Sequence, residues 1–178
     1  MKRALLLLVA LGLGTPSMGR AMKVLPPEKS EYVDASGGLK LTVPGPRGAG
    51  TTLTVVKPLR NTVHKWEKPP QNGVPSAVLM SKERGVVVLL GSLGDPGMSL
   101  GHVEIRSLEG KQLAFIQLSQ SIPDLEELAR NHREKMGNFP WIEEARLDEK
   151  DGVVRIHVCS KVPVRISLTD YKVTVEPH

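Results

Sequence analysis

The sequence predicts an all-β domain with one packed helix. Three observations lead to this prediction. Short runs rich in β-branched residues recur along the chain, turn residues separate these runs, and only one segment has the apolar spacing of an amphipathic helix. The 17 glycines and 14 prolines of the chain fit many short strands joined by turns.

The first 21 residues have the pattern of a cleavable signal peptide. Lys2 and Arg3 precede an apolar run over residues 4–13, and Gly19 and Ala21 place small residues before a cleavage site. The apolar run is only about half of the roughly 20 residues that a membrane span needs. We therefore expect Sec-type export, cleavage after Ala21, no membrane association after cleavage, and a periplasmic or extracellular location.

The rest of the chain has the size and charge of one ordinary domain. We expect a polar extended lead over residues 22–30 and a single β-rich domain over residues 31–178. Removing Lys2, Arg3 and Arg20 from the 24 basic residues leaves 21, against 19 acidic residues. A nucleic-acid partner is not expected, because the chain has no basic stripe and few aromatic residues for stacking.

The first part of the domain alternates β-type runs with loops. Apolar and polar residues alternate over residues 39–43, which predicts a half-buried strand. Residues 51–56 and 63–66 are two further short runs of this kind. The segments 44–50 and 68–73 are rich in glycine and proline, and they are therefore predicted to be loops.

The middle part contains the most apolar run of the domain. Residues 77–80 predict a strand, and residues 85–90 are apolar at every position after the glycine, which is typical of a strand buried on both faces. Residues 102–106 alternate again. Together with the Glu109–Gly110 turn and residues 112–118 they predict a β-hairpin.

One helix is predicted over about residues 122–136. Ser121 suits the N-cap, Pro123 suits the first turn, and Leu125 and Leu128 begin an apolar stripe with helical spacing. Gly137 ends the helix. Strands are expected to resume after it, over residues 141–147, 153–159, 162–168 and 172–175.

Three stretches of the chain are alike. Residues 36–43, 81–88 and 148–155 each contain a polar turn that ends in glycine and leads into a β-type run. The predicted helix and its connections, about 20 residues, lie within the longer of the two intervals between these turns. Without them the period is near 45 residues, with four strand-like runs in each unit.

The middle unit is similar to the blade repeats of secreted β-propellers. The resemblance is best over residues 31–119 and loose over residues 141–176, and such repeats place an acidic-glycine turn before the second strand and between the third and fourth. The chain has no Trp-Asp dipeptide, and it offers three units where closed propellers have about 4–8 blades. Two architectures stay open, an incomplete propeller-like sheet stack and an ordinary β-sandwich or open barrel. A ring completed by oligomerisation is a variant of the first.

Two sets of residues are candidates for binding. A glycine-rich loop before residue 102 allows a ligand to approach the backbone, and loops often carry function. The candidates in it are Gly94, Asp95, Gly97, Ser99, Gly101 and His102. His157 and Cys159 lie two apart on a predicted strand, so they share a face and form a weak pair of metal ligands.

The expected function is non-enzymatic. The resemblance to propeller repeats implies binding more often than catalysis, and no catalytic or metal motif occurs in the sequence. We expect an exported β-rich module that binds a protein or a component of the cell envelope through its loops, without a cofactor. A small hydrolase-like enzyme and an oligomerising structural subunit are the alternatives, and the oligomeric state stays open.

Overall fold

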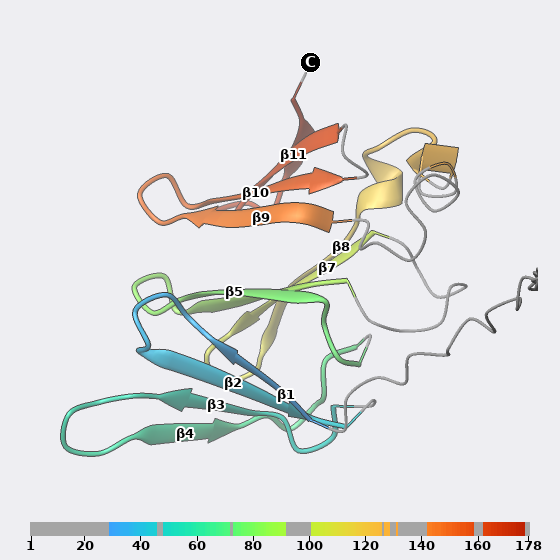
Figure 1. The fold of residues 1–178 in the computed structure, drawn as a ribbon. Helices are drawn as coiled ribbons and strands as arrows, with labels where there is room; N and C mark the ends of the chain where they lie inside the picture. Colours follow the sequence, from blue (N-terminus) through green and yellow to red (C-terminus); the bar gives the residue numbers. More distant parts are fainter. Residues whose placement is uncertain are drawn as a thin grey trace, which may run out of the picture.

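The computed structural model describes residues 29–45, 48–71, 73–91, 101–125, 127–128, 131, 142–158 and 162–176. These residues contain three four-stranded antiparallel sheets, which confirms the all-β prediction (Figure 1). The first sheet contains β1 (Lys29–Val33), β2 (Leu39–Pro44), β3 (Thr52–Val55) and β4 (Thr62–Lys65). The middle sheet contains β5 (Ala77–Ser81), β6 (Val86–Leu90), β7 (His102–Ser107) and β8 (Gln112–Gln117). The last sheet contains β9 (Ile142–Asp148), β10 (Val153–Val158), β11 (Val162–Ser167) and β12 (Val173–Val175).

Each sheet pairs its strands in chain order. Within each sheet, every strand is antiparallel to the next one along the chain, and the three sheets lie on one another as layers (Figure 1). In the described part of the chain this is an open stack, closed neither into a barrel nor into a propeller ring. The sequence predicted eleven of these strands, and it did not predict β1, which begins inside the segment expected to be a polar lead.

The middle sheet has a hydrophobic core on each side. On one face Val88, Leu90 and Val103 pack with Ile156 of the last sheet, and on the other face Leu89 packs with residues of the first sheet. All five residues of β6 are buried, so the prediction of a strand covered on both faces is confirmed. Two cores that share one sheet explain why this run is apolar at consecutive positions.

The three similar stretches of sequence lie at equivalent places. Each forms the turn before the second strand of its sheet, and the last turn residue is Gly38, Gly85 or Gly152. The carbonyl oxygen of this glycine accepts a hydrogen bond from the residue that follows the third strand, at 2.8 Å from Val56, 3.2 Å from Leu108 and 2.9 Å from Leu168. The repeat in the sequence is therefore a repeat in the backbone hydrogen bonding.

The turns also share an acceptor at their first residue. In the first sheet Asp34 accepts hydrogen bonds from the backbone N–H groups of Leu39 at 2.6 Å and Ser36 at 3.3 Å, and from the Ser36 hydroxyl. In the middle sheet, the Ser81 hydroxyl accepts a hydrogen bond from the Arg84 N–H at 3.0 Å. In the last sheet, the Asp148 carboxylate accepts one from the Asp151 N–H at 3.1 Å. Partial burial opposes ionisation of Asp34, but these hydrogen bonds hold its pKa below the ordinary value.

The pKa of Asp34 predicts a stability that depends on pH. We expect Asp34→Ala to cost about 1 kcal/mol at neutral pH, as the loss of other side-chain caps does. Because the folded-state pKa is lowered, this contribution is present above the unfolded value of about 3.9 and is lost as the pH falls through the folded value. Urea unfolding of both proteins at neutral and acidic pH measures it. Asp151→Ala, in the equivalent turn of the last sheet, is the control. If the difference in free energy of unfolding between the wild type and Asp34→Ala is the same at acidic and neutral pH, the prediction is contradicted.

The predicted helix over residues 122–136 lies largely outside the described residues. Leu125, Glu127, Leu128 and Asn131 have helical conformation, and a packed helix of the expected length is not shown. Ser121 does not begin this segment as an N-cap, since it follows the 3-10 turn η1 (Leu118–Gln120) and caps its C-terminal end. Among the described residues, no helix is long and apolar enough to cross a membrane.

The outer faces of the first and last sheets carry charged and polar side chains, and the exposed Val33 and Val63 lie among them on the first sheet. Arg146, Arg155 and Arg165 lie opposite one another across β9, β10 and β11, on the face that points away from the core. Lys40 and Thr54 are paired in the same way on the outer face of the first sheet.

Candidate functional site

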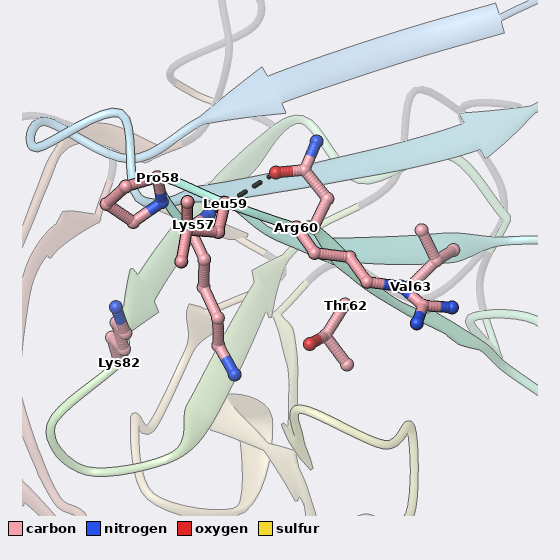
Figure 2. A pocket seen from close by; sticks show the side chains of 8 residues that line it. Lys57, Pro58, Leu59, Arg60, Thr62, Val63 and Lys82 are labelled. Carbon is pink, nitrogen blue, oxygen red and sulfur yellow. Dashed lines mark hydrogen bonds between the residues drawn. The ribbon is translucent and has the colours of Figure 1, made fainter.

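A basic hollow lies beside the loop that joins β3 to β4. Its volume is about 860 Å³, and it is open to solvent. The lining residues come from this loop, from the start of β4 and from the β5–β6 turn: Lys57, Pro58, Leu59, Arg60, Asn61, Thr62, Val63 and Lys82 (Figure 2).

The charge of the hollow is entirely positive. Lys57, Arg60 and Lys82 line it, and no carboxylate does. All three side chains are exposed, and none forms an ion pair with a described residue. An anion in the hollow would meet three cations without having to displace a carboxylate, so anion binding is the chemistry that this arrangement favours.

Exposed apolar side chains lie next to these cations. Leu59 is fully exposed and Val63 is 60% exposed, whereas most large aliphatic side chains of the domain are buried. A single exposed leucine is ordinary on a protein surface. Together with the three cations of this hollow, however, these side chains provide apolar contact area for a partner that also carries negative charge.

Local hydrogen bonds hold the two segments that carry the cations. The N–H of Lys57 donates to the Asn61 side-chain oxygen at 3.3 Å, across the β3–β4 loop (Figure 2). The turn that carries Lys82 is held by Arg84, whose Nε donates to the carbonyl oxygen of Glu149 at 2.8 Å. Packing of the first sheet on the middle sheet then brings Lys82 to a loop some 25 residues before it in the sequence.

Most of the glycine-rich loop predicted as a binding site cannot be placed. Gly94, Asp95, Gly97 and Ser99 lie outside the described residues, so their role stays a prediction. Gly101 is described, and an added Cβ there would lie 3.3 Å from Leu118 Cβ and 2.7 Å from a Leu125 methyl group. Its φ of +93° and this close packing give Gly101 a structural role.

His102 has a packed environment. Its ring stacks on Phe115 with 4.8 Å between the ring centroids. The void that His102 lines with Glu104 and Pro70 has a volume of only about 10 Å³, which is room for one water molecule at most. The described part of the predicted loop therefore offers no space for a larger ligand at His102.

The predicted pair His157 and Cys159 is described only at the histidine. His157 is half exposed, and its Nδ1 lies 3.1 Å from Glu144 Oε2 on the outer face of the last sheet. Cys159 lies outside the described residues. Across the described part of the chain, no three His, Cys, Asp or Glu side chains converge as metal ligands would.

The arginine row of the last sheet is a weaker candidate than the hollow. Arg155 pairs with Glu176 at 2.8 Å, and Glu144 lies on the same outer face beside His157. These carboxylates offset the positive charge of the row, and the row lies on a flat sheet surface. The basic hollow has neither feature, which makes it the better site for an anionic partner.

The sequence did not predict the hollow. We expected binding at the glycine-rich loop before residue 102, where glycine allows a ligand to approach the backbone closely. The signal that was available is the pair of cations, Lys57 and Arg60, that flank Pro58 and Leu59 in one short loop. Lys82 could not be added to them from sequence, because its contribution depends on how two sheets pack.

Comparison with known proteins gives no further guide to the site. No protein-family model matches the sequence, and a search of curated proteins finds no significant match.

Proposed function

We propose that this protein is an exported, non-enzymatic module that binds an acidic protein partner at the basic hollow. The three blade-like sheets serve as a rigid support that holds two turns in fixed relative positions. The signal-peptide pattern of residues 1–21 supports export. The observation that carries the proposal is that Lys57, Arg60 and Lys82 line one hollow, with no carboxylate among its described lining residues.

The composition of the hollow favours a protein over a small anion. A small ligand site is usually enclosed and supplies buried polar groups that fix the ligand's orientation. Here the three cations are exposed, and Leu59 and Val63 extend the contact area with aliphatic surface. Cations at the rim of such a surface steer a negatively charged partner and set its orientation.

Catalysis finds less support in the described residues. A histidine–carboxylate contact joins His157 and Glu144, whose side chains are 50% and 58% exposed. A general base of this kind normally lies in a cleft beside a nucleophile or a substrate site. This pair lies on an open sheet face, so the hydrolase alternative has no assembled site in the described part of the chain.

Binding of fluorescein-labelled poly-glutamate, followed by anisotropy at low ionic strength, tests the proposal. We expect Lys57→Glu/Lys82→Glu to weaken binding by about tenfold, because two attractive charges at the hollow become repulsive. The affinity of the wild-type protein is expected to fall as salt screens these charges.

A second double variant separates the hollow from net charge. Lys111→Glu/Lys150→Glu makes the same change in charge at exposed positions outside the hollow. We expect this protein to bind within about twofold of wild type, since neither side chain lines the hollow and salt screens surface charges that the bound peptide does not contact. Equal losses in the two variants, or no binding by the wild-type protein, would contradict the proposal.

A further inference from the structure

We infer that the partner binds as an added strand on the free edge of β4, with its acidic residues over the basic hollow. The inference rests on the proposed function and adds the mode of recognition and the conformation of the partner. In this mode an extended peptide continues a sheet, so that main-chain hydrogen bonds give affinity and side chains give specificity.

The edge of β4 has backbone groups that point away from the sheet. In the described residues β4 pairs with β3 on one side and with no strand on the other, and Figure 1 shows it at the margin of its sheet. The N–H of Trp66 donates to Thr51 of the β3 side at 2.9 Å. Because N–H directions alternate along a strand, the N–H and C=O groups of Val63 and Lys65 face outward.

The charges along this edge fix the kind of peptide and its direction. The hollow, with its three cations, lies at the loop end of β4, where Thr62 and Val63 line it. At the other end β4 is followed by Trp66, whose indole N–H donates to the Leu108 carbonyl oxygen at 3.1 Å, in the turn that carries Glu109. Hydrogen bonds from the Ser107 side chain and from its own backbone, with a smaller contribution from His64, hold the pKa of Glu109 below its ordinary value. An added strand that is acidic over its whole length would place a negative charge beside Glu109, and the two carboxylates would repel each other. A strand antiparallel to β4 should therefore be acidic in its C-terminal half, which lies over the hollow, and uncharged in its N-terminal half.

Two other edges, those of β8 and β12, do not combine these features. The outer edge of the middle sheet is β8, whose sequence is uncharged and would not select an acidic peptide. The edge strand of the last sheet, β12, has only three residues. Among the edge strands compared, β4 alone has unpaired cations next to outward-facing backbone groups.

Amide hydrogen exchange measured by NMR on the full chain tests the inference. The probe is a short peptide of alternating threonine and valine followed by three glutamates, and the control peptide has the same residues in reverse order. At saturation with the first peptide we expect amide exchange at Val63 and Lys65 to slow by about tenfold or more, because newly formed main-chain hydrogen bonds protect these amide hydrogens. The reversed peptide should bind about fivefold more weakly, because its glutamates meet Glu109 instead of the hollow.

The outcomes separate this inference from the proposed function. Equal affinity for the two peptides, or binding without slower exchange at Val63 and Lys65, would overturn strand addition and leave poly-glutamate binding at the hollow intact. If neither peptide nor poly-glutamate binds, both strand addition and the proposed function would be overturned. Preferential binding to phosphatidylglycerol vesicles over the peptides would assign the cations to a membrane surface and would also overturn the inference.

Discussion

Glu104→Ala is expected to destabilise the domain by about 3–5 kcal/mol, the cost of removing one partner from a buried ion pair. Such a loss is a large share of the roughly 5–15 kcal/mol by which single domains are stable. Urea unfolding followed by circular dichroism measures it as a shift of the midpoint at unchanged slope.

The size of this effect follows from where the pair lies. Glu104 and Arg106 are each 3% exposed, and Arg106 Nε donates to Glu104 at 2.7 Å. The other oxygen of Glu104 accepts from the Gln71 N–H at 2.9 Å. Arg106 also donates to the carbonyl oxygens of Lys68 at 2.6 Å and Pro69 at 2.7 Å. The pair thus fastens the segment between the first and middle sheets, and alanine would leave the guanidinium buried without its counter-charge.

The exposed pair of the last sheet provides a matched control. Glu176→Ala also removes a carboxylate 2.8 Å from an arginine, Arg155, but these two side chains are 39% and 30% exposed. Water and salt screen such a pair, so we expect a cost below about 1 kcal/mol. Similar costs for Glu104→Ala and Glu176→Ala would show that burial of the first pair does not decide its contribution.

The same pair shows where the sequence misleads. Residues 102–106 alternate apolar and charged residues, which predicts a strand with one face in solvent. The strand forms as predicted, in β7, but its charged face is buried because the middle sheet is covered on both sides. Whether a sheet is central depends on contacts between distant segments, and only the unbroken apolar run of β6 carried that information in the sequence.

The limits of prediction differ between strands and site. Turn glycines and alternating runs located most strands, since both signals are local. β1 was missed because its five residues are mostly polar and it pairs only with β2. The basic hollow was missed for a different reason. Lys57 and Lys82 are ordinary surface lysines in sequence, and they share a site only after two sheets have packed.

Gly110→Ala is expected to cost about 2–4 kcal/mol, although it adds a single methyl group. Gly110 has a φ of +89°, a conformation that costs about 1 kcal/mol for alanine. The added Cβ would lie 2.9 Å from Trp66 Cβ and would overlap the indole ring at Cγ and Cδ1. Forcing extra volume into a packed site typically costs about 1–3 kcal/mol more.

The damage should spread through Trp66 to the contacts around it. Its indole N–H donates to the Leu108 carbonyl oxygen at 3.1 Å, and the Arg106 guanidinium lies 5.0 Å from the centre of its ring. The carbonyl oxygen of Gly110 itself accepts a hydrogen bond from the Arg106 guanidinium at 3.2 Å. Displacing the indole therefore disturbs the network that fastens the segment between the first and middle sheets, so we expect the Trp66 indole N–H resonance to shift.

Gly37→Ala separates the overlap from the backbone conformation. Gly37 has a φ of +69°, and nothing lies within 4 Å of the Cβ position there, so this variant carries only the conformational cost of about 1 kcal/mol. Urea unfolding of the two variants should then differ by the cost of displacing Trp66. Equal losses, with an unmoved indole resonance in Gly110→Ala, would mean that the site relaxes around the new methyl group and that the close packing of Trp66 on this turn is dispensable.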